Sequence, residues 1–296
     1  MNSARLLRRY LDPDRSPFLY LAPTLLFLLL FLVYPIADVL RQSVFHNVPI
    51  RPHEGTPFVG LGNFVTLVGM QRFQEALGIT VTWTVLSVSG KLVIGFIASL
   101  ILQHQFRGRR MYLTLFMIPW VTPIVVAAVA WRWVLNSQYG QLNAFLSLLG
   151  VSGAVWLGET TTAFVMTAVV DMWVGIPFVT LVLMAGLQSI PDEHYEAARV
   201  DGAGWFAILR YVTIPGIRHI MLVVALLSTV WTFNSFQVIW PLTRGGPARA
   251  TTTLVIATYR TAFESFDFGI GAAYSTVIFA ILLTVSVGYW RLIRSE

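Results

Sequence analysis

The sequence has 296 residues, of which 56% are hydrophobic and only 11% are charged, and its mean hydropathy is +0.70. Because soluble domains carry roughly 25% charged residues, this composition excludes a water-soluble globular protein and predicts an integral membrane protein. The absence of cysteine excludes disulfides and thiolate metal sites, and the net charge of +6 is better explained by arginines at cytoplasmic helix ends than by nucleic-acid binding.

Six segments have the length and composition of membrane-spanning helices, which need about 20 mainly apolar residues. Such long apolar runs predict an all-α, polytopic fold rather than a barrel. The predicted spans cover residues 18–40, 79–102, 111–135, 161–187, 216–239 and 268–293. Without a strong internal repeat or linker, residues 18–296 are expected to form one membrane domain. Residues 1–17 are expected to form a cytoplasmic tail, either as a short interfacial helix or as a disordered segment.

Clustered arginines predict how the spans are oriented. They occur in the N-terminal tail, in the turn after the second span and in the C-terminal tail, and with six spans these three segments fall on one side of the membrane. The clustered residues are Arg5, Arg8, Arg9, Arg15, Arg107, Arg109, Arg110, Arg291 and Arg294. The positive-inside rule assigns this side to the cytoplasm, so both termini and the loop at about 188–215 are expected there.

Motifs for catalysis or nucleotide binding are missing from the sequence. It lacks H-E-x-x-H, G-x-S-x-G and any cluster of His, Asp and Glu at metal-ligand spacing. Gly90-Lys91 does not belong to a phosphate-binding loop, because Leu92 replaces the required Ser or Thr. If the protein carries out active transport, its energy must therefore come from the membrane potential or from another subunit.

The loop at 188–215 is polar and charged, and it lies between two strongly apolar segments. Ser189 is predicted to cap a helix whose first turn contains Pro191, Asp192 and Glu193, and Gly202 is predicted to end it. The small side chains in this loop permit close approach of a partner protein. The alternative is an amphipathic helix that lies on the lipid surface.

This loop resembles the EAA motif of ABC-importer permeases. The matching residues are Glu196-Ala197-Ala198, then Gly202 and, about a dozen residues later, Ile214-Pro215. Further segments that resemble sugar-type permeases lie at 58–64, 140–150, 185–191 and 242–254. Together they resemble the carbohydrate-uptake permeases of the maltose and glycerol-3-phosphate type, as the first (MalF/UgpA-like) member of a permease pair with the type I importer fold.

The resemblance implies a hetero-oligomer that is embedded in the inner membrane and contacts its lipid. A second permease would complete the pore, two ATPase subunits would bind ATP and Mg²⁺, and an extracytoplasmic binding protein would deliver the solute. This chain would bind no cofactor, metal or nucleic acid. By position, the ATPase contact would be made by Glu193, Glu196, Ala197, Ala198, Asp201, Gly202 and Ala203.

The solute is expected to be a sugar or sugar derivative, with an anionic glycerol or sugar phosphate or sulfonate as the alternative. The six predicted spans lack the extra spans and large outer domain of the maltose permease, so its substrate is not carried over. Rivals from other classes are a polytopic membrane enzyme, which would need clustered acids or histidines, and a secondary transporter, which would need repeat symmetry.

Lys91 and Asp171 are the two ionisable residues deep in the predicted spans. A charge at the bilayer centre costs about 2.5–3.5 kcal/mol on insertion scales, so each needs a partner or a wet cavity. Their predicted depths are similar. Three interpretations stay open: a structural ion pair, a pore lysine that pairs with an anionic solute, and either side chains that snorkel to the membrane surface or a misplaced span end.

The end of the fifth predicted span, residues 231–240, alternates aromatic residues with amides and hydroxyls. Aromatic faces bind the C–H groups of sugars and amides bind their hydroxyls, so this pattern suits a carbohydrate path. We select Trp231, Asn234 and Gln237 as candidates, together with Trp173 of the fourth span. The alternative is ordinary helix packing with an interfacial tryptophan. Prolines in the third and fourth spans could kink these helices.

Overall fold

The computed structural model describes residues 17–294, so the predicted interfacial helix at the N-terminus lies outside the described residues. Within this range the chain is helical, with a single antiparallel bridge between Phe45 and Phe58 as its β pairing. The described chain divides into two compact units. The smaller contains residues up to Leu67 and Thr261–Val277, and the larger contains Val68–Arg260 and the residues from Ile278 on.

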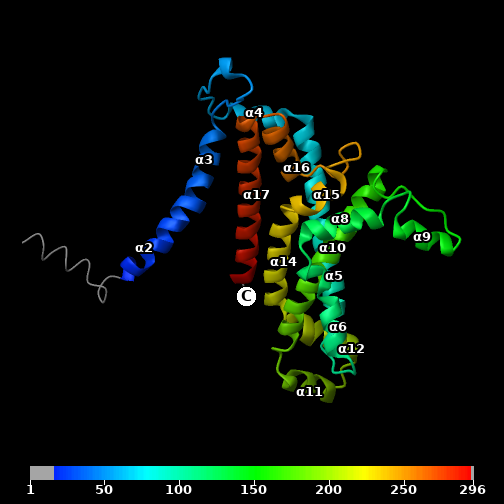
Figure 1. The fold of residues 1–296 in the computed structure, drawn as a ribbon. Coiled ribbons are helices and arrows are strands. Elements are labelled where there is room, and N and C mark those ends of the chain that lie inside the picture. The colour runs from blue at the N-terminus through cyan, green and yellow to red at the C-terminus, as the bar shows by residue number, and fades with distance from the viewer. Residues whose placement is uncertain (1–16, 295–296) are drawn as a thin grey trace, which may run out of the picture. The chain divides into compact units, whose positions relative to one another are not determined.

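Five helical stretches of the described chain are long and apolar enough to cross a membrane. They are Tyr20–Gln42, Gln71–Leu102 (α5), Thr160–Leu187 (α10), Arg218–Thr243 and Phe268–Arg294 (α17). The predicted bounds agree within a few residues except for α5, which begins at Gln71 instead of residue 79. This long helix crosses the larger unit from end to end (Figure 1).

The third predicted span is not a single straight helix. It consists of α6 (Arg109–Phe116), α7 (Ile118–Val121) and α8 (Ile124–Val134), with a bend of 96° before α8. Pro123 explains the bend, because a residue that precedes proline avoids the helical region, and Thr122 has an extended ψ of 131°. Residues 17–294 therefore contain five candidate spans, or six when this bent pair counts as one.

The fifth predicted span is also interrupted. Its helix α14 (Arg218–Phe233) ends before Asn234, and α15 (Phe236–Thr243) begins after Ser235. The two residues between them have ψ angles of 21° and 56°, outside the helical range. The prediction of one continuous helix is therefore wrong at a point inside the apolar segment.

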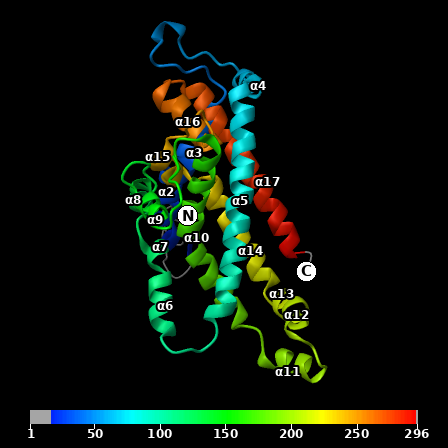
Figure 2. The same cartoon turned by 90° about the vertical axis from the view of Figure 1, so that its right-hand side faces the viewer.

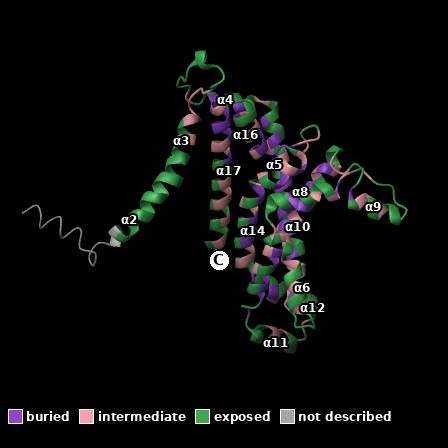
Figure 3. Ribbon diagram, in the orientation of Figure 1, coloured by how far each residue is buried: buried purple, intermediate pink, exposed green. Residues whose placement is uncertain are grey.

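The core of the larger unit lies between α5, α10 and α14, where buried residues concentrate (Figure 3). One apolar cluster comprises Val179, Leu183, Leu187, Ile190, Ile217 and Val224. Helices α5 and α10 approach closely at Gly95, because a Cβ atom there would lie 2.7 Å from Val179 Cγ1. A small residue is therefore needed at this contact, as at many helix crossings in membranes.

Short helices connect these spans. They are α9 (Gln141–Leu148), α11 (Asp192–Val200), α12 (Trp205–Ile208), η3 (Leu209–Thr213), α13 (Ile214–Gly216), α16 (Leu254–Tyr259) and η4 (Arg260–Glu264). Figure 2 shows α11 at the end of the larger unit where α5 ends and α6 begins, whereas α15 and α16 lie toward the opposite end. The ends of α5 and α10 line one common hollow, so both helices run toward the α11 end.

The smaller unit contains α2 (Pro17–Leu28), η1 (Leu29–Val33), α3 (Tyr34–Gln42), η2 (Pro52–Glu54) and most of α4 (Gly62–Gly69). The Asn63 amide stabilises its loop by donating to the Ser43 and Phe45 carbonyls, each over 2.9 Å. His46 Nε2 lies 2.8 Å from a carboxylate oxygen of Glu54, and this hydrogen bond lowers the pKa of Glu54. The loop after the first span is thus tied together by side chains.

Candidate functional site

The first candidate site is the exposed loop that holds α11. The helix begins at Asp192, and Asp192 and Glu193 lie in its first turn as predicted, where their charge is favourable to the helix dipole. The predicted N-cap at Ser189 is wrong. Its hydroxyl donates to the Gly186 carbonyl over 2.7 Å and so stabilises the end of α10 instead.

The end of α11 confirms that Gly202 stops the helix. Gly202 has φ of +77°, and its N–H donates to the Arg199 carbonyl over 3.0 Å. The next N–H, from Ala203, donates to the Ala198 carbonyl over 2.9 Å. These two bonds form a Schellman motif, in which glycine is favoured at the left-handed position. The glycine of the Glu-Ala-Ala motif is therefore required by the backbone.

The surface of α11 is open to solvent, and none of its residues is buried. Among the seven residues predicted to contact an ATPase, Ala198 and Ala203 are half-buried. The exposed ones are Glu193, Glu196, Ala197, Asp201 and Gly202. A hollow of about 770 Å³ lies beside the helix, and Tyr195, Glu196 and Arg199 line it together with the ends of α5 and α10. This loop thus offers a small-residue helix face with acidic side chains.

The second candidate site begins with an ion pair between α5 and α10. Lys91 Nζ lies 2.6 Å from Asp171 Oδ2, and each side chain is 7% exposed. The direction of approach falls outside hydrogen-bond geometry, so the attraction is chiefly ionic. Of the three interpretations given above for these residues, this geometry agrees with the structural ion pair.

Each charged group of the pair also bonds to the interrupted fifth span. The Lys91 ammonium donates to the Thr232 hydroxyl over 2.8 Å, and the Ser235 hydroxyl donates to Asp171 Oδ1 over 3.0 Å. Gly175 makes room for the lysine, since a Cβ atom there would lie 2.7 Å from Lys91 Cε. The pair therefore joins three spans at the break between α14 and α15.

A cavity of about 660 Å³ lies next to this break. Its aromatic wall contains Trp120, Phe178 and Trp231, with ring centroids 5.8 Å apart for Trp120 and Phe178 and 4.9 Å apart for Phe178 and Trp231. The amides of Asn234 and Gln237 supply polar groups, and both residues are exposed. An aromatic wall with a few polar groups is typical of small-molecule sites.

Most of the residues predicted for a substrate path meet in this cavity. Lys91, Asp171, Trp231, Asn234 and Gln237 line it. Trp173 does not, because its ring packs edge to face against Trp131 at 5.5 Å. Trp120 and Phe178 also line the cavity and were not predicted from the sequence, although each directly follows a proline in an apolar span and that pattern could have indicated them.

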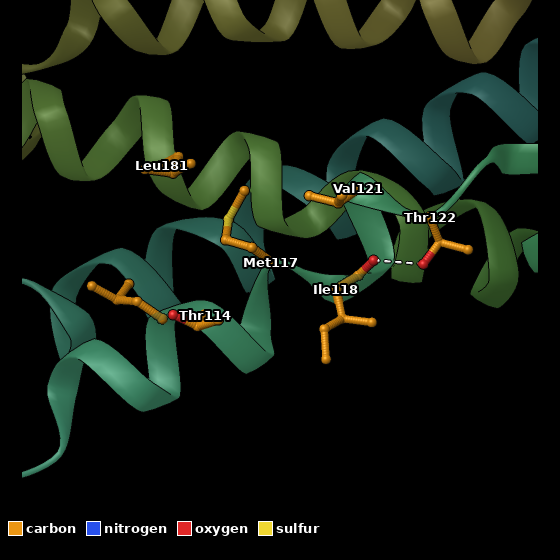
Figure 4. Close-up of a pocket in the computed structure, with 7 residues that line it drawn as sticks. Thr114, Met117, Ile118, Val121, Thr122 and Leu181 are labelled. Carbon is orange, nitrogen blue, oxygen red and sulfur yellow. Dashed lines mark hydrogen bonds between the residues drawn. The ribbon is translucent and has the colours of Figure 1, made fainter.

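A separate hollow of about 560 Å³ lies along α6, α7 and α10. Figure 4 shows Thr114, Met117, Val121 and Leu181 around it, and the Thr122 hydroxyl donates to the Ile118 carbonyl over 2.7 Å where α7 ends. Its lining is mostly apolar and uncharged, so it provides no chemistry for a polar solute. The described residues also contain no group of three or more His, Cys, Asp or Glu that could hold a metal.

Two of the segments that resemble sugar-type permeases, at 140–150 and 242–254, contain side chains that stabilise their loops. The Asn143 side chain donates to the carbonyls of Ser137 and Ala154 and accepts from the Ala154 N–H and from the Trp156 indole, over 2.7–3.1 Å. In the later loop, the Thr252 hydroxyl donates to the Gly245 carbonyl over 2.8 Å. These side chains fix loop shape, which explains why such residue types are needed there.

Comparisons with known proteins agree on one family. Residues 91–293 match the family described as binding-protein-dependent transport system inner membrane component. The chain is 34% identical to the trehalose/maltose transport system permease protein MalF of Thermococcus litoralis, over 94% of this chain and 93% of that protein. It is 31% identical to the sulfoquinovosyl glycerol transport system permease protein SmoG of Agrobacterium fabrum, over 94% of this chain and 90% of that protein.

Solved structures confirm the fold. A chain of a bacterial ABC transporter involved in the import of the acidic polysaccharide alginate superposes with a TM-score of 0.83, covering 97% of this chain and 99% of that chain. At 23% sequence identity this likeness is evidence for the fold alone. A chain of a methionine ABC transporter, MetNI, reaches a TM-score of 0.55 over 76% of this chain.

Proposed function

This chain belongs to the family of binding-protein-dependent transport system inner membrane components, and we propose that it forms half of the pore of an ABC importer for a neutral sugar or sugar derivative. Membership makes it a transport subunit of the inner membrane and not an enzyme. A second permease would supply the other half of the pore. Both termini and the α11 loop would lie in the cytoplasm.

The cavity beside the α14–α15 break is the observation that carries this proposal. The faces of Trp120, Phe178 and Trp231 would pack on the apolar C–H surfaces of a sugar ring, and the amides of Asn234 and Gln237 would bind hydroxyl groups. The relative named for trehalose and maltose transport supports a solute of this class.

The charge of the cavity favours a neutral solute. Lys91 and Asp171 are the charged residues that line it, and their formal charges cancel at a separation of 2.6 Å. An anionic sugar or glycerol phosphate or sulfonate would enter this site without an unpaired cation to bind it, and burying an unpaired charge is costly. The anionic solute stays the alternative, because one relative is named for the transport of sulfoquinovosyl glycerol, which carries a sulfonate.

Solute uptake would test the cavity. The complex, purified with its partner permease, ATPase and binding protein, is reconstituted into vesicles, and uptake of trehalose is compared with uptake of a glycerol phosphate. Trp231→Ala should reduce uptake strongly, whereas Trp133→Ala should not, because Trp133 is 61% exposed and packs edge to face against Tyr139 outside the cavity. Uptake of the glycerol phosphate alone would reverse the choice of solute class.

The α11 loop would transmit ATP binding to the spans. We assign the seven residues of this loop that were predicted to contact an ATPase to a groove on that partner. The ATPase, and not this chain, would hold ATP and Mg²⁺. Glu196→Lys should abolish co-purification of the ATPase, whereas Glu159→Lys, an exposed charge reversal at the start of α10, should not. Retention of the ATPase by Glu196→Lys would contradict this assignment and favour the lipid-surface alternative.

A further inference from the structure

The ion pair of the larger unit lies at the break of the fifth span and bonds to the helix before it and to a residue within it. Thr232, in the last turn of α14, accepts from Lys91, and Ser235, in the break itself, donates to Asp171. Thr232 is 1% exposed and both charged residues are 5% exposed. Lys91 therefore contacts the segment before the break and Asp171 contacts the segment within it.

Backbone carbonyls near the break, which lack their usual helical hydrogen bonds, accept hydrogen bonds from side chains instead. The Thr232 carbonyl accepts from the Trp83 indole N–H over 3.0 Å, and the Val230 carbonyl accepts from the Asn234 amide over 3.0 Å. Within a membrane, a helix can be interrupted only where protein or a wet cavity satisfies such groups. The break is thus built from specific contacts with α5 and is not a frayed helix end.

We propose that Lys91 and Asp171 act as a positioning clamp, which holds residues 234–235 unwound so that Asn234 and Gln237 face the cavity. The two charged residues are buried, whereas the two amide residues are exposed. The clamp is a property of this chain's own contacts. That the amides bind a sugar rests on the proposed function.

The clamp explains why two buried charges occur where one hydrogen bond could have sufficed. The ion pair gives each charged residue a second partner, one before the break and one within it. Gly175 is part of this arrangement, because any larger residue on α10 would displace the lysine. Lys91 is then a positioning residue and not a counter-ion for the solute.

The lack of cysteine makes the break directly measurable. Asn234→Cys in the full chain, in native membrane vesicles, introduces a single thiol, and its labelling rate with a charged, water-soluble thiosulfonate reports how it faces the cavity. The rate is measured with native Ser235, with Ser235→Ala and with Lys91→Met plus Asp171→Leu. Ser89→Ala is the matched control, since that exposed hydroxyl bonds only to its own helix.

We expect Ser235→Ala to lower the labelling rate about fivefold, the factor that corresponds to one lost hydrogen bond, and the double variant to lower it at least as far. Ser89→Ala should leave it unchanged. A second reporter, Val230→Cys, lies before the break in the same cavity and should keep its rate in every background. Equal rates at residue 234 in all backgrounds, or a parallel fall at residue 230, would overturn the clamp.

Uptake by the reconstituted complex gives an independent readout. Ser235→Ala should raise the KM for solute while basal ATP hydrolysis stays unchanged, and Ser235→Thr, which keeps the hydroxyl, should restore the native KM. A lower maximal rate at native KM would overturn the positioning role. If the native complex takes up no sugar but the labelling pattern holds, the proposed substrate fails and the clamp stands.

Discussion

Removing one member of the Lys91–Asp171 pair should destabilise the protein far more than removing both. Each side chain is 7% exposed, so Lys91→Met leaves the Asp171 carboxylate buried with the Ser235 hydroxyl as its remaining partner. Breaking a buried pair in this way costs about 3–5 kcal/mol, whereas replacing both members by apolar residues of similar volume is often neutral or stabilising. The double variant Lys91→Met with Asp171→Leu should therefore lie within about 1 kcal/mol of the native protein.

The free energy of unfolding can be measured by titrating the purified chain with SDS in mixed micelles and following its helix content. The two single variants and the double variant complete a double-mutant cycle, and Ser89→Ala provides the control. We expect a coupling energy of several kcal/mol. If the losses of unfolding free energy were additive, so that the double variant lost as much as the two single variants together, the ion pair would be refuted as the cause of the destabilisation.

Three further predictions follow from the packing, hydrogen bonds and backbone conformation of single residues in the larger unit. Gly95→Val should lower the free energy of unfolding by about 1–3 kcal/mol through overpacking against Val179, and an unchanged SDS midpoint would contradict this. Asn143→Leu should cost at least about 2 kcal/mol by removing four hydrogen bonds, and protease cleavage at 136–158 should accelerate. Gly202→Val should lose ATPase stimulation because of its φ of +77°, whereas Gly204→Ala, at φ of −73°, should retain it.

Local sequence signals predicted the parts of the fold that depend on local chemistry. The apolar runs located the spans, and Gly202 ended α11 because only its backbone conformation permits that turn. The bend at Pro123 also has a local cause, although the apolar pattern alone continued through it. In contrast, Ser189 was assigned to the wrong helix, because a hydroxyl between two helices can bond to either.

The break at Asn234 and Ser235 had no such signal. Neither residue is proline or glycine, and the interruption depends on Lys91 and Asp171, which belong to two other spans. The aromatic wall was missed for a related reason, since its residues come from three segments distant in the sequence. Contacts between spans, and not the residue pattern of any one span, determine the candidate site.

The 96° bend at Pro123 changes how the chain crosses the membrane between α5 and α10. Both of these helices end at the α11 end of the larger unit, so the segment between them must return to the opposite face (Figure 2). The stretches Arg109–Val121 and Ile124–Val134, of 13 and 11 residues, are only about 20 and 16 Å long, and each alone is too short for a hydrocarbon core of about 30 Å.

The segment between α5 and α10 is therefore built from two half-helices that meet at nearly a right angle. Trp120 and Ile124 flank the joint, and both line the cavity beside the α14–α15 break. Two helix interruptions from different spans thus border the same cavity. A solute in this cavity would therefore lie beside both interruptions, which contribute side chains to its wall without any added charged residue.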